Sequence, residues 1–189
     1  MRLAVLALGA NLPFADSPAQ TTLQLVMKEL QGLESSRVLA SSRLWRSAPV
    51  MAEGPMFFNA CSLVETSLEP LPLLEMLLAL ENQWGRIRGP KPNHARAAAR
   101  TLDLDLIWME GTVVDSPRLS LPHPRACSRG FVLGPLRDLD PWLGGRLTLP
   151  HPLTGEPRCP EDLWLLLPEA ARNDSQPVAE PIDPIERAA

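Results

Sequence analysis

The chain has 189 residues, of which 45% are hydrophobic, and its 18 basic and 22 acidic side chains give a formal charge of −4. This length indicates a single domain whose core needs no disulfide or metal to hold it together. No apolar run reaches the roughly 18–20 residues of a membrane span, and the weak negative charge is unlike the basic surface of a general nucleic-acid binder, so we expect neither a membrane nor a nucleic-acid partner.

The first two thirds of the chain alternate between strand and helix patterns. The apolar run at residues 3–8, followed by Gly9-Ala10-Asn11, predicts a buried strand ending in a tight turn rather than a signal peptide. Ser17-Pro18 predicts a helix with Ser17 as its N-cap, since apolar residues follow at helical spacing as far as Leu33. The remaining predicted elements are strands at 37–46, 57–66 and 101–108, a loop at 47–55 and a leucine-rich helix at 72–84 that ends at Gly85.

The order β-α-β-β-α-β predicts an α+β fold of the ferredoxin-like type. Such a fold has an antiparallel sheet with both helices on one face, which leaves the other face for loops and ligands. Extra C-terminal elements are expected after this core: a short strand at 112–114 and short helices at 128–136 and 161–167. We expect one domain over residues 1–170, followed by a disordered acidic, proline-containing tail over 171–189, because no apolar period is present from Asn173 onward.

The three cysteines are Cys61, Cys127 and Cys159, and their spacing forms no CxxC pair and no disulfide framework. We interpret them as idle thiols of a cytoplasmic protein. The alternative, a zinc or redox site, would normally show closely spaced ligand pairs.

Two carboxylates on one strand carry the clearest chemical signal. Asp103 and Asp105 lie two residues apart, so both point to the same face while Leu104 enters the core. Paired carboxylates without nearby histidine or cysteine suit Mg²⁺. The alternative is an exposed strand face whose acids meet water.

Basic residues are dense around this pair, and arginine grips the phosphate oxygens that Mg²⁺ also binds. The pattern indicates a nucleoside triphosphate with its metal, although 16 of the 18 basic residues of the chain are arginine, so part of the enrichment is compositional. A GxxxxGK[ST] motif is missing, which excludes a P-loop kinase. The basic residues concerned are Arg86, Arg88, Lys91, Arg96, Arg100, Arg118, Arg125 and Arg129.

Six segments follow one another in a more specific pattern: Leu8-Gly9-Ala10-Asn11-Leu12, Trp45-Arg46-Ser47-Ala48-Pro49, Phe57-Phe58-Asn59-Ala60, Glu81…Gly85-Arg86-Ile87-Arg88, Arg100-Thr101-Leu102-Asp103-Leu104-Asp105-Leu106 and Pro122-His123…Arg129-Gly130-Phe131. The last two are highly specific in combination. Together the segments cover about residues 3–140 and resemble the 6-hydroxymethyl-7,8-dihydropterin pyrophosphokinase family of folate biosynthesis.

The resemblance implies transfer of diphosphate from ATP to the hydroxymethyl group of 6-hydroxymethyl-7,8-dihydropterin, with release of AMP. It implies that Asp103 and Asp105 hold two Mg²⁺ ions and that Arg86, Arg100 and Asp105 are catalytic. The implied ATP-binding residues are Glu81, Arg86, Arg88, Arg100, Arg118, His123 and Arg129. The implied pterin-binding residues are Ser47, Ala48, Val50, Phe57, Asn59, Asp103 and Phe131. Protein partners remain unknown.

The chain also departs from the family pattern. Ala97-Ala98-Ala99 replaces an aromatic-Gly-Pro triplet, so a bulky residue that could cover a closed site is missing, and Ala10 stands where serine is common. Two other functions stay open from the residues alone: a DxD glycosyltransferase or metal-dependent phosphohydrolase, and a non-catalytic ferredoxin-like ligand-binding domain.

Overall fold

The computed structural model describes residues 1–49, 54–86 and 100–178. An antiparallel sheet is built around β1 (Arg2–Ala10), which pairs with β4 (Phe57–Thr66) on one side and with β5 (Asp103–Met109) on the other. On the outer side of β4, β2 (Ser36–Ser41) and β3 (Trp45–Ser47) pair with successive parts of the same strand. Within the described residues the path across the sheet is β10-β3-β4-β1-β5.

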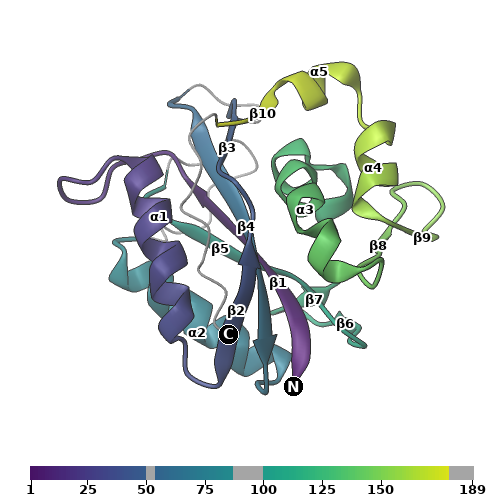
Figure 1. Cartoon of the computed structure of the whole chain (residues 1–189), viewed down its shortest axis with the longest axis horizontal. Coiled ribbons are helices and arrows are strands. Elements are labelled where there is room, and N and C mark those ends of the chain that lie inside the picture. Colours follow the sequence, from purple (N-terminus) through teal and green to yellow (C-terminus); the bar gives the residue numbers. More distant parts are fainter. Residues whose placement is uncertain (50–53, 87–99, 179–189) are drawn as a thin grey trace.

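Two helices cover one face of this sheet, as Figure 1 shows. They are α1 (Ala19–Glu29) and α2 (Pro70–Gln83). Strand side chains alternate between the faces, so every second residue of β1 and β5 points toward these helices. The predicted ferredoxin-like β-α-β-β-α-β core is therefore confirmed. The core on this face includes Leu6, Leu8, Leu23, Leu77, Leu104 and Leu106.

The order of the core elements predicts that the opposite face of the sheet is left for loops and ligands. The structure corrects this expectation, because helices also lie on that face. There α3 (Gly130–Leu143) packs against the sheet, α4 (Pro160–Leu166) packs against α3, and together they form a second core (Figure 1). This second core includes Val5 and Ile107, whose side chains point away from the first core, together with Leu133, Leu136 and Trp164. Helix α3 is much longer than the helix predicted at 128–136.

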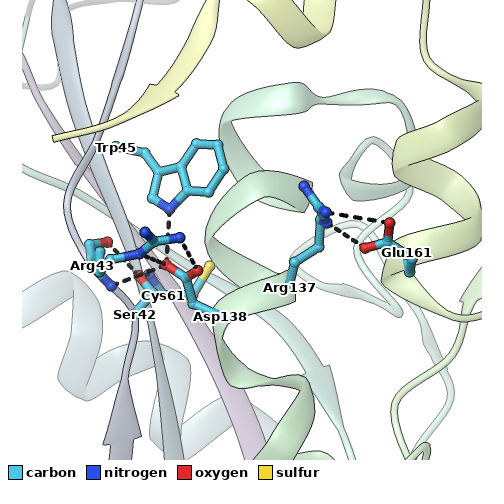
Figure 2. A network of polar contacts seen from close by, with 7 residues as sticks. All are labelled: Ser42, Arg43, Trp45, Cys61, Arg137, Asp138 and Glu161. Atoms are coloured by element: carbon cyan, nitrogen blue, oxygen red, sulfur yellow. Dashed lines mark hydrogen bonds and ion pairs between the residues drawn. The ribbon is translucent and has the colours of Figure 1, made fainter. Parts of the chain in front are cut away.

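A polar network joins α3 to the break between β2 and β3, where a single strand was predicted (Figure 2). The Asp138 carboxylate accepts hydrogen bonds from the Arg43 guanidinium at 2.8 Å and from the Trp45 indole N–H at 2.9 Å. A Cβ atom at Gly134 would lie 2.7 Å from the Trp45 ring, so α3 approaches β3 closely here. Ser42 bridges the break, because its hydroxyl accepts the Cys61 N–H at 2.9 Å.

The C-terminal region contradicts the expected disorder of its first residues. Helix α5 (Glu169–Asn173) leads into β10 (Ser175–Pro177), which pairs with β3. The backbone N–H of Val178 donates to Leu44 O at 2.8 Å and extends this attachment. Backbone hydrogen bonds order the segment, and these require no apolar period in the sequence. The rest of the predicted tail, residues 179–189, lies outside the described residues.

Other boundaries differ in smaller ways. Helix α1 begins at Ala19 with Pro18 in the N-cap position, because Ser17 instead exchanges backbone hydrogen bonds with Phe14 at 3.0 Å. Short hairpins join β6 (Val114–Asp115) to β7 (Ser120–Leu121) and β8 (Leu149–Pro150) to β9 (Pro157–Arg158), and single turns of 3-10 helix lie at Leu30–Gly32 and Ala126–Ser128. Among the described residues, no helix is long and apolar enough to cross a membrane.

Candidate functional site

A cavity of about 420 Å³ opens where the sheet meets α3 and the C-terminal segment. Its floor is formed by the ends of β1 and β5, and its sides by β3, β4, the start of α3 and the α5–β10 segment. The residues that line it include Ser47, Ala48, Phe57, Asn59, Arg100, Asp103, Asp105, Arg129, Gly130, Phe131, Ala171, Asp174 and Ser175.

Asp103 and Asp105 both line this cavity from β5. They lie opposite Gly9 and Ala7 of β1, and the intervening Leu104 is buried in the core on the other face. The alternation of the strand therefore places two carboxylates side by side on the cavity floor, as the sequence pattern predicts.

Two arginines meet the Asp103 carboxylate. Arg86, which follows the end of α2, lies 3.2 Å from Asp103 Oδ1, and Arg100 forms a closer ion pair with Oδ2. The Arg100 guanidinium also lies 5.6 Å from the centre of the Phe57 ring. Asn11 fixes the Arg100 backbone, because its side-chain oxygen accepts the Arg100 N–H at 2.8 Å and its own N–H donates to Arg100 O at 3.0 Å.

Asp105 lies in a different electrostatic setting. Burial raises the pKa of its carboxyl above the usual value, and the negative charge of Asp103 raises it further. His123 and Arg129 oppose this shift. Burial also lowers the pKa of both His123 and Arg129, so this corner of the site holds polar groups that are partly withdrawn from water.

The carboxylate pair fits a hard divalent cation. Two adjacent carboxylates supply oxygen ligands of the type that Mg²⁺ prefers, and a cation between them would offset the repulsion that raises the pKa of Asp105. In the parts of the chain that the structure describes, no group of three or more His, Cys, Asp or Glu side chains forms a metal site. Mg²⁺ is commonly bound by one or two carboxylates together with water and substrate phosphates, and the aspartate pair supplies such carboxylates.

Glu81 forms a hydrogen bond to β5, the strand that carries Asp103 and Asp105. This residue of α2 is fully buried, and its carboxylate accepts the Leu104 N–H at 2.8 Å. The backbone of Arg86 is tied to the same residue, since its N–H donates to Glu81 O at 3.0 Å. Glu81 is not among the residues that line the cavity, and its hydrogen bond reaches the strand between the two aspartates.

The cavity lining also includes aromatic and amide groups. Asn59 is buried and donates to the Ser47 hydroxyl at 3.0 Å, which orients its side chain across the β3–β4 pair. Phe57 lies on β4 and Phe131 on α3, and both rings line the cavity. The Arg129 guanidinium lies 5.3 Å from the centre of the Phe131 ring. A flat, polar ring system could be held between such faces and read at its edge by the amide.

Most predicted site residues gather here, but several do not. Arg118 is exposed and pairs with Glu75 of α2 at 3.0 Å, so it lies away from the cavity lining. His123 lies behind the lining, and its side chain accepts the Arg125 N–H at 3.2 Å. Two further predicted contacts, Arg88 and Val50, fall outside the described residues, as does the Ala97-Ala98-Ala99 departure.

The C-terminal wall of the cavity was not predicted. It is formed by Ala171, Asp174 and Ser175, which come from the region expected to be disordered. The role of Asn11 was also missed, although the residue stands in the Leu8-Gly9-Ala10-Asn11-Leu12 segment at the end of β1. The available signal was that Asn11 directly follows a buried strand in the sequence, where a turn is expected.

Comparison with known proteins identifies the family of the chain. The model of the family "7,8-dihydro-6-hydroxymethylpterin-pyrophosphokinase (HPPK)" matches residues 5–141. A 2-amino-4-hydroxy-6-hydroxymethyldihydropteridine pyrophosphokinase of Pseudomonas aeruginosa is 38% identical over 136 residues, covering 71% of this chain and 78% of the relative. One from Synechocystis sp. is 37% identical over 144 residues, covering 76% and 69%.

Solved structures of similar fold include an HPPK-DHPS in complex with substrates, with a TM-score of 0.59 and 11% identity. The alignment covers 87% of this chain but only 45% of that one, so the chain spans less than half of the solved protein. At this identity the likeness concerns the fold alone, whereas the sequence match extends over most of the residues that build the cavity. The chain therefore belongs to the 7,8-dihydro-6-hydroxymethylpterin-pyrophosphokinase family.

Proposed function

We propose that this pyrophosphokinase transfers the β,γ-diphosphate of ATP to the hydroxymethyl oxygen of 6-hydroxymethyl-7,8-dihydropterin. The new bond joins that oxygen to the β-phosphorus, the bond from the β-phosphorus to the AMP oxygen breaks, and the hydroxyl proton is lost. One observation carries the proposal: a single cavity joins a carboxylate pair flanked by arginines to an aromatic pocket with a buried amide.

The pterin would occupy the aromatic end. Phe57 and Phe131 supply apolar faces, and Asn59 supplies both a donor and an acceptor for the polar edge of the ring. Ser47 and Ala48, at the end of β3, complete this end of the cavity, and Val50 is proposed as a further contact. Asn59 and Asp103 both lie beside Gly9, so a hydroxymethyl group on a ring held here would lie near the carboxylate pair.

The phosphates of ATP would lie beside the carboxylate pair and its arginines. Arg100 and Arg129 line the cavity there, and Arg86 reaches the same carboxylate as Arg100. Phosphate oxygens accept paired hydrogen bonds from guanidinium groups, so these arginines can bind the transferred diphosphate and balance its charge. Glu81, Arg88, Arg118 and His123 stay proposed nucleotide contacts, although the contacts of Glu81 and Arg118 described above favour structural roles for both.

Asp103 and Asp105 would hold the Mg²⁺ that accompanies ATP, with two ions expected. When bound, Mg²⁺ neutralises the charge that develops on the phosphate oxygens and orients them. Arg86 and Arg100 now neutralise Asp103. We infer that these guanidinium groups pass at least part of their hydrogen bonding from Asp103 to phosphate when substrate binds, since each has several donors to share.

We also propose that the protein acts in the cytoplasm. Its three cysteines are free thiols, which suits a reducing compartment.

Incubation of the purified protein with MgATP and the pterin alcohol tests the proposed reaction. We expect equal amounts of AMP and pterin diphosphate, and no turnover after a chelator removes the divalent cation. Inorganic phosphate formed without the pterin would indicate a phosphohydrolase instead. Binding of ligands without any product would indicate a non-catalytic domain.

A further inference from the structure

We propose that the C-terminal segment 169–178 forms the third wall of the pterin pocket, and that the Ser175 hydroxyl makes a polar contact with the bound pterin. The proposal rests on the proposed function and adds a specificity residue to it. The match to the family model ends at residue 141, so this wall comes from a part of the chain that the family pattern does not describe.

The first observation is the position of the segment. β10 pairs antiparallel with β3, and in this register Ser175 lies opposite Ser47, whose hydroxyl accepts the Asn59 amide. Ala171, Asp174 and Ser175 line the same cavity as Asn59 and Phe131. The segment therefore lies directly beside the groups proposed to read the pterin edge.

The second observation is the close packing of this wall. A Cβ atom at Gly130 would lie 2.6 Å from the Ala171 carbonyl oxygen and 2.9 Å from Ser175 Oγ. The start of α3 and the α5–β10 segment thus touch at a point where only glycine fits. Because β3 holds the segment from one side and α3 from the other, it is a fixed wall of the cavity.

The third observation concerns the hydrogen bonding of Ser175. Its residue surface is only 3% exposed, and its hydroxyl forms no hydrogen bond with any residue in the described parts of the chain. Ser47 and Asn59, in contrast, already share one hydrogen bond. A hydroxyl can both donate and accept, and leaving it without a partner costs free energy when a ligand excludes water. A pterin, with donors and acceptors around its ring, supplies the missing partner.

The test compares Ser175→Ala with Gln176→Ala in the full chain. Gln176 is exposed on the same strand, and its side chain donates to the carbonyl oxygens of Arg172 and Asn173 at 3.3 and 3.2 Å. It does not line the cavity, so Gln176→Ala loosens the join between α5 and β10 without removing a pocket group. Calorimetric titration with a non-hydrolysable ATP analogue, then with the pterin alcohol, gives both dissociation constants.

We expect Ser175→Ala to raise the pterin dissociation constant by about two- to tenfold, the range for one lost hydrogen bond, and to leave the nucleotide constant unchanged. Gln176→Ala should change neither constant, and both variants should melt near the wild-type temperature. Unchanged pterin binding in Ser175→Ala would overturn the inference, as would an equal loss of both ligands or an equal effect of the control. If the wild-type chain bound no pterin, the proposed function itself would fail, which is a distinct result.

Discussion

The Glu81 carboxylate accepts the backbone N–H of Leu104 at 2.8 Å, and this bond is made at the strand position between Asp103 and Asp105. A helix residue on one face of the sheet thus fixes the backbone from which both site carboxylates project on the other face. This bond links the first core to the site, because α2 belongs to that core and the cavity opens on the opposite face of the sheet.

Glu81→Ala is expected to destabilise the fold. The substitution leaves the Leu104 N–H buried without its partner and removes a fully buried side chain, so the free energy of unfolding should fall by about 1–3 kcal/mol. Urea denaturation followed by circular dichroism measures this. The control is Glu75→Ala on the same helix, whose exposed pair with Arg118 should contribute less than about 1 kcal/mol. Equal losses in the two variants would contradict the role given to Glu81.

Asp138→Ala is expected to weaken the attachment of β3 to α3. The carboxylate accepts hydrogen bonds from the Arg43 guanidinium and the Trp45 indole (Figure 2), and its loss leaves the largely buried indole N–H unpaired. We expect a loss of about 1–3 kcal/mol in the free energy of unfolding. Asp140→Ala, at an exposed position of the same helix, is the control and should change stability by less than about 0.5 kcal/mol.

Arg100→Ala is expected to lower turnover by about 100-fold or more, because it removes a charged donor aimed at the transferred phosphates. The fold should be retained, as measured by thermal unfolding. Arg146→Ala is the control: this exposed arginine pairs with Glu110 at 3.5 Å outside the cavity. Similar losses of turnover in both variants would mean that the arginines around the site reflect composition only.

The carboxylate pair could be predicted from sequence because it depends on local geometry alone. Alternation along one strand places Asp103 and Asp105 on one face and Leu104 on the other, whatever the rest of the chain does. The order of strands and helices could be predicted in the same way, because the spacing of apolar residues within each element indicates its type. That order indicated the topology of the core. Asn59, Phe57 and Phe131 could be placed together only through the family resemblance, because they come from β4 and α3, which are far apart along the chain.

The C-terminal wall could not be predicted for a physical reason. Ser175-Gln176-Pro177 has no apolar face, and its order comes from backbone hydrogen bonds to β3, which sequence patterns do not show. The break between β2 and β3 could not be predicted either. It depends on contacts that Asp138 and Gly134 of α3 make with Arg43 and Trp45, which are far from α3 along the chain. Arg118 was grouped with the site by its position in a basic stretch, yet its partner is a surface glutamate.

The cysteines provide a test of the second core. Burial raises the pKa of the Cys61 and Cys127 thiols, whereas Cys159 is partly exposed at the start of α4, where its sulfur accepts the Asp162 N–H at 3.5 Å. Since the thiolate is the reactive form, we expect Cys159 to react first with an aromatic disulfide reagent, and all three thiols to react after denaturation. Rapid reaction of Cys61 in the native protein would contradict the second core. Cys159→Ser identifies the fast thiol.

The pterin end of the cavity is tested by Asn59→Ala. Asn59 is 4% exposed and lines the cavity beside Ser47, and the nucleotide is assigned no contact with it. Loss of its amide leaves one edge group of the pterin unpaired, so pterin binding should weaken by about 1–3 kcal/mol. Phe131→Ala should also weaken pterin binding, but through lost apolar contact area rather than lost hydrogen bonding.

Calorimetry with the nucleotide analogue first and the pterin second separates the two ligands in each variant. Asn59→Ala also removes the hydrogen bond to the Ser47 hydroxyl, so thermal unfolding must show that the variant is folded at the titration temperature. Ser47→Ala breaks the same internal bond and keeps the amide, and it should therefore cost less pterin affinity than Asn59→Ala. If the two variants lost equal affinity, or if nucleotide binding fell as much as pterin binding, Asn59 would act by packing β3 against β4 and not by reading the pterin edge.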